Sequence, residues 1–192
     1  MATTYFALLL SSALILLWEW RAGKRSPRTL VQTRVDKWYW FFVTPFITGV
    51  LTRATTFGVL VAVTSSGKSS LPQTFISSTP ALFQFGIALI LADAVGYVSH
   101  RIRHTQLWWR FHAIHHSATS LDALAAARMH PLDDMLDNTL VGATLLLLGF
   151  DWQVYAWMGP LLLLHTAFTH SNMQRGWGRL EYFIVTLSLI HI

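Results

Sequence analysis

The sequence predicts an all-α, multi-pass membrane protein: a transmembrane helical bundle of about three spans plus a membrane hairpin. Of its 192 residues, 53% are hydrophobic and 12% are charged, whereas a typical soluble domain has about 25% charged residues. The mean hydropathy is +0.44, and apolar runs of about 20 residues, the length needed to cross a bilayer, recur along the chain. A disordered chain, a fibrous repeat and an ordinary cytosolic domain are poorly compatible with this composition.

The N-terminal transmembrane region, residues 1–80, contains the first two predicted helices. The first runs from Thr3 to Trp20, and no Lys or Arg precedes it, so we expect a retained anchor rather than a cleaved signal peptide. The second runs from Trp38 to Val63 and contains Arg53, which must pair, snorkel or face the bundle interior. The loop between them is mostly basic, so the positive-inside rule places it in the cytoplasm.

The second predicted region covers residues 81–192. A third span, Ala81 to Ser99, returns the chain to the cytoplasm, where several arginines follow it. The last apolar stretch, Asn138 to Phe168, is divided near Gly149, and we expect a hairpin that enters from the cytoplasmic side and turns back. Tryptophans lie near most of the predicted segment ends, where they serve either as interfacial anchors or as core aromatics.

Histidines are concentrated after the third span: eight of the nine lie between positions 100 and 170. His100 and His104 are four residues apart, and His112, His115 and His116 follow as a second cluster. On a helix, both spacings place the rings on one face within reach of a shared ion. The chain has no cysteine, so imidazole and carboxylate are the ligands left for a transition metal. The pattern predicts a metal centre on the cytoplasmic side, with two clusters that could hold two ions.

A polar stripe precedes these histidines on the same helix. Asp93, Tyr97, His100 and His104 are separated by four, three and four residues and share one helical face. Asp93 could accept an N–H from a metal-bound imidazole or form a structural ion pair with Arg53. Tyr97 could hydrogen-bond near the site or simply pack.

Of the four histidines outside the two clusters, three precede the C-terminal segment. His130 precedes Pro131 and by itself would be a loop histidine before a helix. His165 lies in an apolar run, where an imidazole needs a partner. A hairpin would bring His165 and His170 to the height of the first clusters.

Four motifs follow one another along the C-terminal part of the chain. They are Asp93-x-x-x-Tyr97-x-x-His100-Arg101-x-x-His104, Trp109-Arg110-Phe111-His112-x-x-His115-His116-Ser117, Arg128-x-His130-Pro131-Leu132 and His170-Ser171-Asn172. This ordered set resembles the fatty acid hydroxylase and sterol desaturase superfamily of integral-membrane non-haem di-iron oxygenases. The resemblance covers about residues 81 to 192.

The resemblance implies a site and a reaction. Two non-haem iron ions would activate dioxygen, the co-substrate, and the enzyme would hydroxylate or desaturate a C–H bond of a fatty acyl or sterol-like lipid. Electrons would come from an external cytochrome, ferredoxin or reductase, since no His-Pro-Gly-Gly haem motif is present. The implied ligands are His100, His104, His112, His115, His116 and His170, with His130, His165, His191 and Asp93 as further ligands or neighbouring contacts.

The C-terminal segment departs from the family pattern. Relatives carry a third box, His-x-x-His-His, after a Val-Thr-Pro-like segment, whereas here Leu187 stands at the proline position and only His191 lies near the start of the box. We therefore expect a chain truncated before this box. The alternatives are a catalytically inactive member and a non-enzymatic metal- or haem-binding membrane protein.

Two other classes of function are disfavoured by the sequence. A zinc membrane protease is a weaker alternative because His-Glu-x-x-His is absent. The basic residues cluster at predicted membrane edges, so anionic lipid headgroups are more plausible partners than nucleic acid.

Overall fold

The computed structural model describes residues 29–65, 76, 78–119 and 122–170, together with positions 10, 13, 14, 17 and 21. Every regular element in these residues is a helix, which confirms the all-α prediction. The predicted span Thr3–Trp20 is described only at isolated positions, and Leu187 and His191 lie outside the described residues. The division of the chain near residue 80 stays a prediction.

One long helical stretch forms the N-terminal arm of the described structure. It consists of α2 (Leu30–Trp38), the π-helical segment η1 (Tyr39–Thr48) and α3 (Gly49–Ser65). A capping box starts it: Thr29 Oγ1 accepts from the Gln32 backbone N–H, and Gln32 Oε1 accepts from the Thr29 backbone N–H. The helix thus begins at Leu30, earlier than the predicted Trp38, because this cap precedes the apolar run.

The central helix α4 (Ala81–Arg103) extends the predicted third span. Its last turn continues past Ser99 and carries His100 and Arg103. Two stretches, Leu30–Val63 and Ala81–Arg103, are long and apolar enough to cross a membrane. These two helices support the prediction of a membrane protein. The number of spans, and the side of the membrane on which the histidines lie, stay predictions.

Short elements connect α4 to a helical hairpin. They are α5 (Gln106–His112) and the 3-10 turns η2 (His115–Ser117) and η3 (Ala125–Ala127). The hairpin follows as α6 (Pro131–Leu147) and α7 (Trp152–Thr169).

The hairpin turn lies at Gly149, as the sequence predicted. Gly149 has φ +83°, which glycine adopts without a steric penalty. Its N–H donates to the Leu146 carbonyl, and the Phe150 N–H donates to the Leu145 carbonyl. This is a Schellman cap, and the buried side chains of Leu145 and Phe150 complete it.

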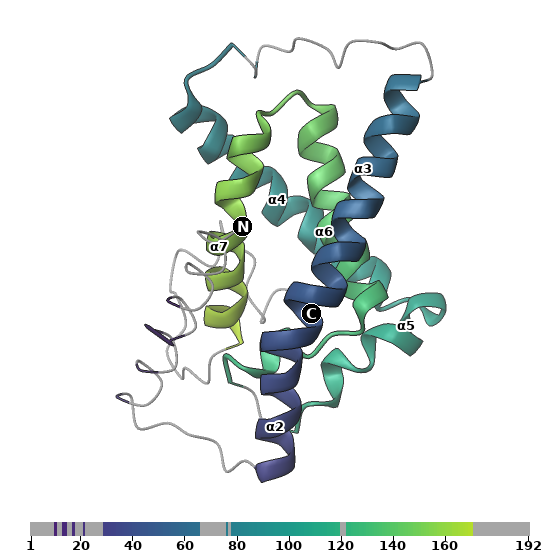
Figure 1. Ribbon diagram of the computed structural model, residues 1–192, viewed down its shortest axis with the longest axis vertical. Coiled ribbons are helices and arrows are strands. Elements are labelled where there is room, and N and C mark those ends of the chain that lie inside the picture. Colours follow the sequence, from purple (N-terminus) through teal and green to yellow (C-terminus); the bar gives the residue numbers. More distant parts are fainter. Residues whose placement is uncertain are drawn as a thin grey trace.

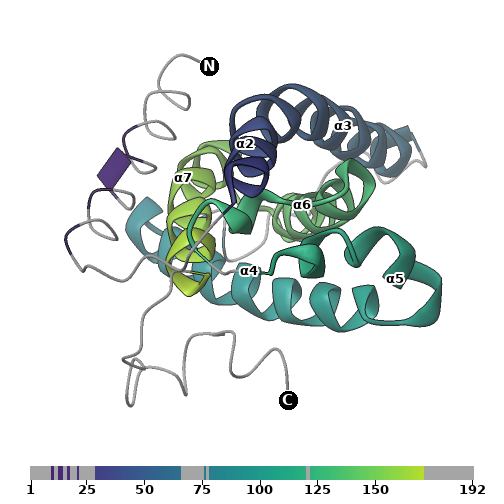
Figure 2. The same ribbon diagram turned by 90° about the horizontal axis from the view of Figure 1, so that it is seen from below.

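Helix α6 packs between α3 and α4, and α7 packs against α4 (Figures 1 and 2). Alanines of α4 meet aliphatic residues of α6 and α7 in the main core. Since α4 and α7 run antiparallel to α6, the C-terminal ends of α4 and α7 lie near the N-terminal end of α6 (Figure 1). This arrangement brings His100, Asp133 and His170 to the same end of the bundle.

A second, smaller core lies beside this end. Trp40 of η1 packs against the buried alanines of η3 and against Ala167 of α7. A buried ion pair joins the same elements: Arg128 Nε and Nη2 lie 2.6 and 2.5 Å from Asp36 Oδ1. The N-terminal arm is therefore tied to the segment that leads into α6.

Candidate metal centre

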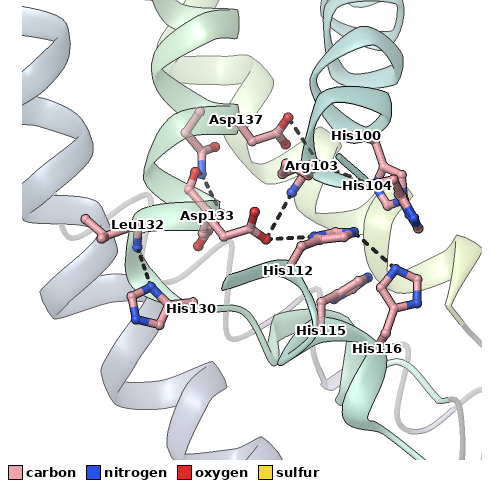
Figure 3. Close-up of polar contacts among 12 residues, drawn as sticks. His100, Arg103, His104, His112, His115, His116, His130, Leu132, Asp133 and Asp137 are labelled. Atoms are coloured by element: carbon pink, nitrogen blue, oxygen red, sulfur yellow. Dashed lines mark hydrogen bonds and ion pairs between the residues drawn. The ribbon is translucent and has the colours of Figure 1, made fainter. Parts of the chain in front are cut away.

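Four imidazoles converge where α4, α5 and η2 meet (Figure 3). One ligand nitrogen from each lies within 4.8 Å of the others. We call this set the four-histidine group; its members are His100, His104, His112 and His116. His100 and His112 are buried, whereas His104 is exposed and His116 is half-buried.

The nitrogen spacing within two pairs of the group fits a shared transition-metal ion. His104 Nε2 is 3.0 Å from His100 Nε2, and His116 Nε2 is 3.1 Å from His112 Nε2. A metal lies about 2.0–2.1 Å from an imidazole nitrogen, so nitrogens that share an ion are about 3–4 Å apart. An all-imidazole donor set suits iron, zinc, copper or nickel.

A separate pair of histidines lies next to this group. His115 Nε2 is 3.0 Å from His170 Nε2, and the His170 Nδ1–H donates to the Thr166 carbonyl at 2.7 Å. Burial, and then the neighbouring His170, lower the pKa of His115 well below its usual value. His115 is therefore neutral at pH 7, which is the form that binds a metal. We call His115 and His170 the interhelix pair.

The members of the second histidine cluster thus have different nitrogen partners. Helix α5 ends at His112, and the chain then tightens into the 3-10 turn η2. This change of helix type turns His115 toward α7, while His116 stays over His112. The α-helical spacing in the sequence could not have shown this difference.

The remaining candidates among the described residues lie outside the four-histidine group. His130 caps α6, because its Nδ1 accepts from the Leu132 backbone N–H at 3.1 Å. In Figure 3, Asp133 lies between His130 and the four-histidine group. His165 is a half-buried residue of α7, and Asp93 and Tyr97 lie earlier on α4. Their predicted roles stay predictions, as does that of His191.

Two residues that the sequence-based interpretation did not single out contact the histidines. Asp133 Oδ2 is 2.8 Å from His112 Nδ1, and Arg103 Nη1 is 3.5 Å from the same oxygen. Arg103 Nη2 is also 3.4 Å from His100 Nδ1 and 3.4 Å from Asp137 Oδ1. The position of Asp133 shortly after His130 could have indicated a role near the histidines. Asp134 and Asp137 follow equally closely, however, so the sequence did not indicate which acid reaches them.

Comparison with known proteins gives the context for this geometry. A family model described as "Fatty acid hydroxylase" matches residues 85–191, a range that includes the four-histidine group and the interhelix pair. The chain is similar to the ornithine lipid hydroxylase OlsE of Rhizobium tropici, with 33% identity over 108 residues. The match covers 56% of this chain and 33% of OlsE, so the chain matches about a third of that relative's length. No solved structure matches the chain.

Proposed function

This chain belongs to the fatty acid hydroxylase family, and from that premise we propose that it is a membrane-bound, iron-dependent oxidoreductase that hydroxylates or desaturates a lipid C–H bond with dioxygen. The observation that supports this most directly is the four-histidine group, whose ligand nitrogens lie within 4.8 Å of one another. Bound iron would supply the activation of dioxygen.

The four-histidine group would hold one iron ion through its convergent nitrogens. The interhelix pair would contribute to a second ion, because its two Nε2 atoms are 3.0 Å apart and the acceptor at Thr166 leaves His170 Nε2 free of a proton. Two ligands leave a metal's coordination incomplete, so we propose that His165 or His191 adds to this second site. Neutral imidazoles also resist oxidation better than thiolates would beside activated dioxygen.

The lipid would reach the site from the bilayer. Trp109 is 41% exposed, and its ring lies 5.5 Å from that of His104 and 5.3 Å from that of His116. We propose that an acyl chain approaches over the exposed part of Trp109, and that the same ring limits the access of water to the group.

The substrate and electron donor belong to the same proposal. The name of OlsE states that it hydroxylates ornithine lipid, which makes ornithine lipid the first substrate to test for this chain. An external cytochrome, ferredoxin or reductase would supply the electrons from the cytoplasmic side.

Metal analysis and turnover test the proposal together. The full chain, purified in detergent from iron-supplemented cells, is expected to retain iron. With NADPH as the electron source, a ferredoxin, its reductase and ornithine lipid, it is expected to consume oxygen and yield a product that is heavier by one oxygen atom after hydroxylation or lighter by two hydrogen atoms after desaturation. The comparison variant is His112→Ala, which removes a member of the four-histidine group and should retain less iron and yield less product.

The alternative predicts other results. Protein that stays free of metal after iron loading and yields no product would favour an inactive member of the family. A haem absorption band without such a product would favour a haem-binding membrane protein.

A further inference from the structure

We infer that Asp133, supported by Arg103, is a positioning residue that fixes the ring and the tautomer of His112 for metal binding. The inference rests on the proposed function in one respect: it takes the four-histidine group to be a metal site. It adds a carboxylate that contacts Nδ1 of a ligand histidine, the ring nitrogen on the side away from the proposed metal, and that is not itself a ligand.

The geometry determines which nitrogen of His112 carries the proton. Asp133 Oδ2 lies 2.8 Å from His112 Nδ1, and both side chains have 0% exposure. A carboxylate only accepts, so His112 Nδ1–H donates. In the neutral ring, Nε2 then keeps its lone pair, and this is the atom that faces His116 in Figure 3.

Arg103 makes an ionised carboxylate tolerable at this depth. Burial of an unpaired charge is strongly unfavourable, and the Arg103 side chain, only 4% exposed, lies 3.5 Å from Asp133 Oδ2. Asp137 lies 3.4 Å from the same guanidinium but is 28% exposed. Arg103 therefore supplies the positive charge that a buried carboxylate at this position needs as a partner.

His100 has a different neighbour behind it. Its Nδ1 lies 3.4 Å from Arg103 Nη2, and a guanidinium has only donors. His100 Nδ1 therefore faces a cation, whereas His112 Nδ1 faces an anion. An anionic acceptor raises the basicity of a metal-bound imidazole and holds its orientation. His112 should therefore contribute more to metal affinity than His100.

A purely structural role for Asp133 is the competing explanation, because the residue also joins α4, α5 and α6. That role predicts a change in unfolding alone. A positioning role predicts a change in the metal affinity of the folded protein.

Metal titration of matched variants separates these two roles. Full-length wild type, Asp133→Asn and Asp137→Asn are titrated with Co²⁺ in detergent, followed by the visible absorption of the metal, and the thermal unfolding of each metal-free protein is recorded. We expect Asp133→Asn to lower the Co²⁺ affinity about tenfold, the lower end of the range for such partners, because an amide oxygen still accepts but carries no charge. Asp137→Asn should leave the affinity unchanged, since Asp137 pairs with Arg103 and not with a member of the group.

Equal Co²⁺ affinity of folded Asp133→Asn and wild type would overturn the inference while leaving the proposed function intact. Failure of the wild type to bind Co²⁺ or iron would instead count against the proposed function.

Nitrogen NMR of histidine-labelled, metal-free wild type tests the tautomer without any change at Asp133, which matters if Asp133→Asn does not fold. His112→Gln identifies the His112 signals. The expected tautomer carries its proton on Nδ1. A proton on Nε2 would overturn the inference.

Discussion

The four-histidine group and the interhelix pair lie side by side but are built in different ways. All four members of the group come from residues 100–116, a stretch in which α4 leads directly into α5 and η2. The interhelix pair joins His115 to His170, 55 residues later, across the entire α6–α7 hairpin. The group thus depends mainly on local helix geometry and the pair on how the hairpin packs, so the two should respond to different substitutions.

The largest effect is expected from His112→Ala, which removes the ligand held by Asp133. Metal affinity of the group should fall by more than about 100-fold, because the loss of an outer partner alone costs about 10- to 100-fold. Metal content and Co²⁺ titration measure the loss. His100→Ala should lose less, and the reverse order would contradict the asymmetry between these two ligands.

Asp36→Asn should destabilise the fold. It should weaken metal binding at the interhelix pair more than at the group, because the same arm packs through Trp40 against Ala167, three residues before His170. The substitution leaves Arg128 buried without a full counter-charge, and such losses cost about 3 kcal/mol or more. The free energy of unfolding in detergent gives the magnitude. Lys37→Gln, an exposed change on the same helix, is the control and should have little effect.

Gly142→Val should separate the two sites most clearly. A Cβ at Gly142 would lie 3.1 Å from the Tyr155 hydroxyl oxygen and 3.2 Å from its ring carbons, so the Tyr155 ring must move by a few tenths of an ångström. The larger valine should displace it further and push α7 away from α6. Overpacking of this kind costs about 1–3 kcal/mol. The metal stoichiometry should fall as His170 moves, while the group keeps its affinity. Gly159→Ala, which meets no atom within 4 Å, is the matched control on α7.

A result in which Gly142→Val weakens both sites equally would show that the group also depends on hairpin packing. That outcome would remove the distinction between a locally built and a hairpin-built site.

The smallest effect is expected from Thr29→Ala, which removes the capping box of α2. Loss of an N-cap costs about 1 kcal/mol. The cap contacts no histidine among the described residues, although Gln32 of the same box contacts Thr119, two residues after η2. Thermal unfolding should therefore change, and metal affinity at the group and at the pair should change little. A change in affinity at either site would show that the arm is coupled to the histidines.

Much of the fold was predictable because its signals are local. Apolar runs predicted the helical stretch that ends near Val63 and the helix from Ala81, and the division at Gly149 marked the hairpin turn. The spacing of His100 and His104 also predicted a shared face, since residues four apart neighbour each other on any α-helix. The hydropathy pattern did not predict the start of this helix at Leu30, because α2 is mostly polar and precedes the apolar run.

Contacts between distant segments could not be predicted in the same way. Asp36 and Arg128 are separated by 92 residues, and no spacing rule joins them. Asp133 and Asp134 are adjacent in the sequence, yet Asp133 faces His112 whereas Asp134 accepts from Asn138 within α6. Successive residues on a helix point about 100° apart, so the packing of α6 decides which acid reaches the site.

The sequence by itself therefore determined a helical, apolar, cysteine-free chain whose histidines are spaced to share an ion. Only the tertiary structure decided that His115 pairs with His170, that Asp133 lies behind His112, and that Arg103 lies between two carboxylates. The reason is physical: helical periodicity sets which side chains share one face, whereas the antiparallel packing of α4, α6 and α7 sets which faces meet.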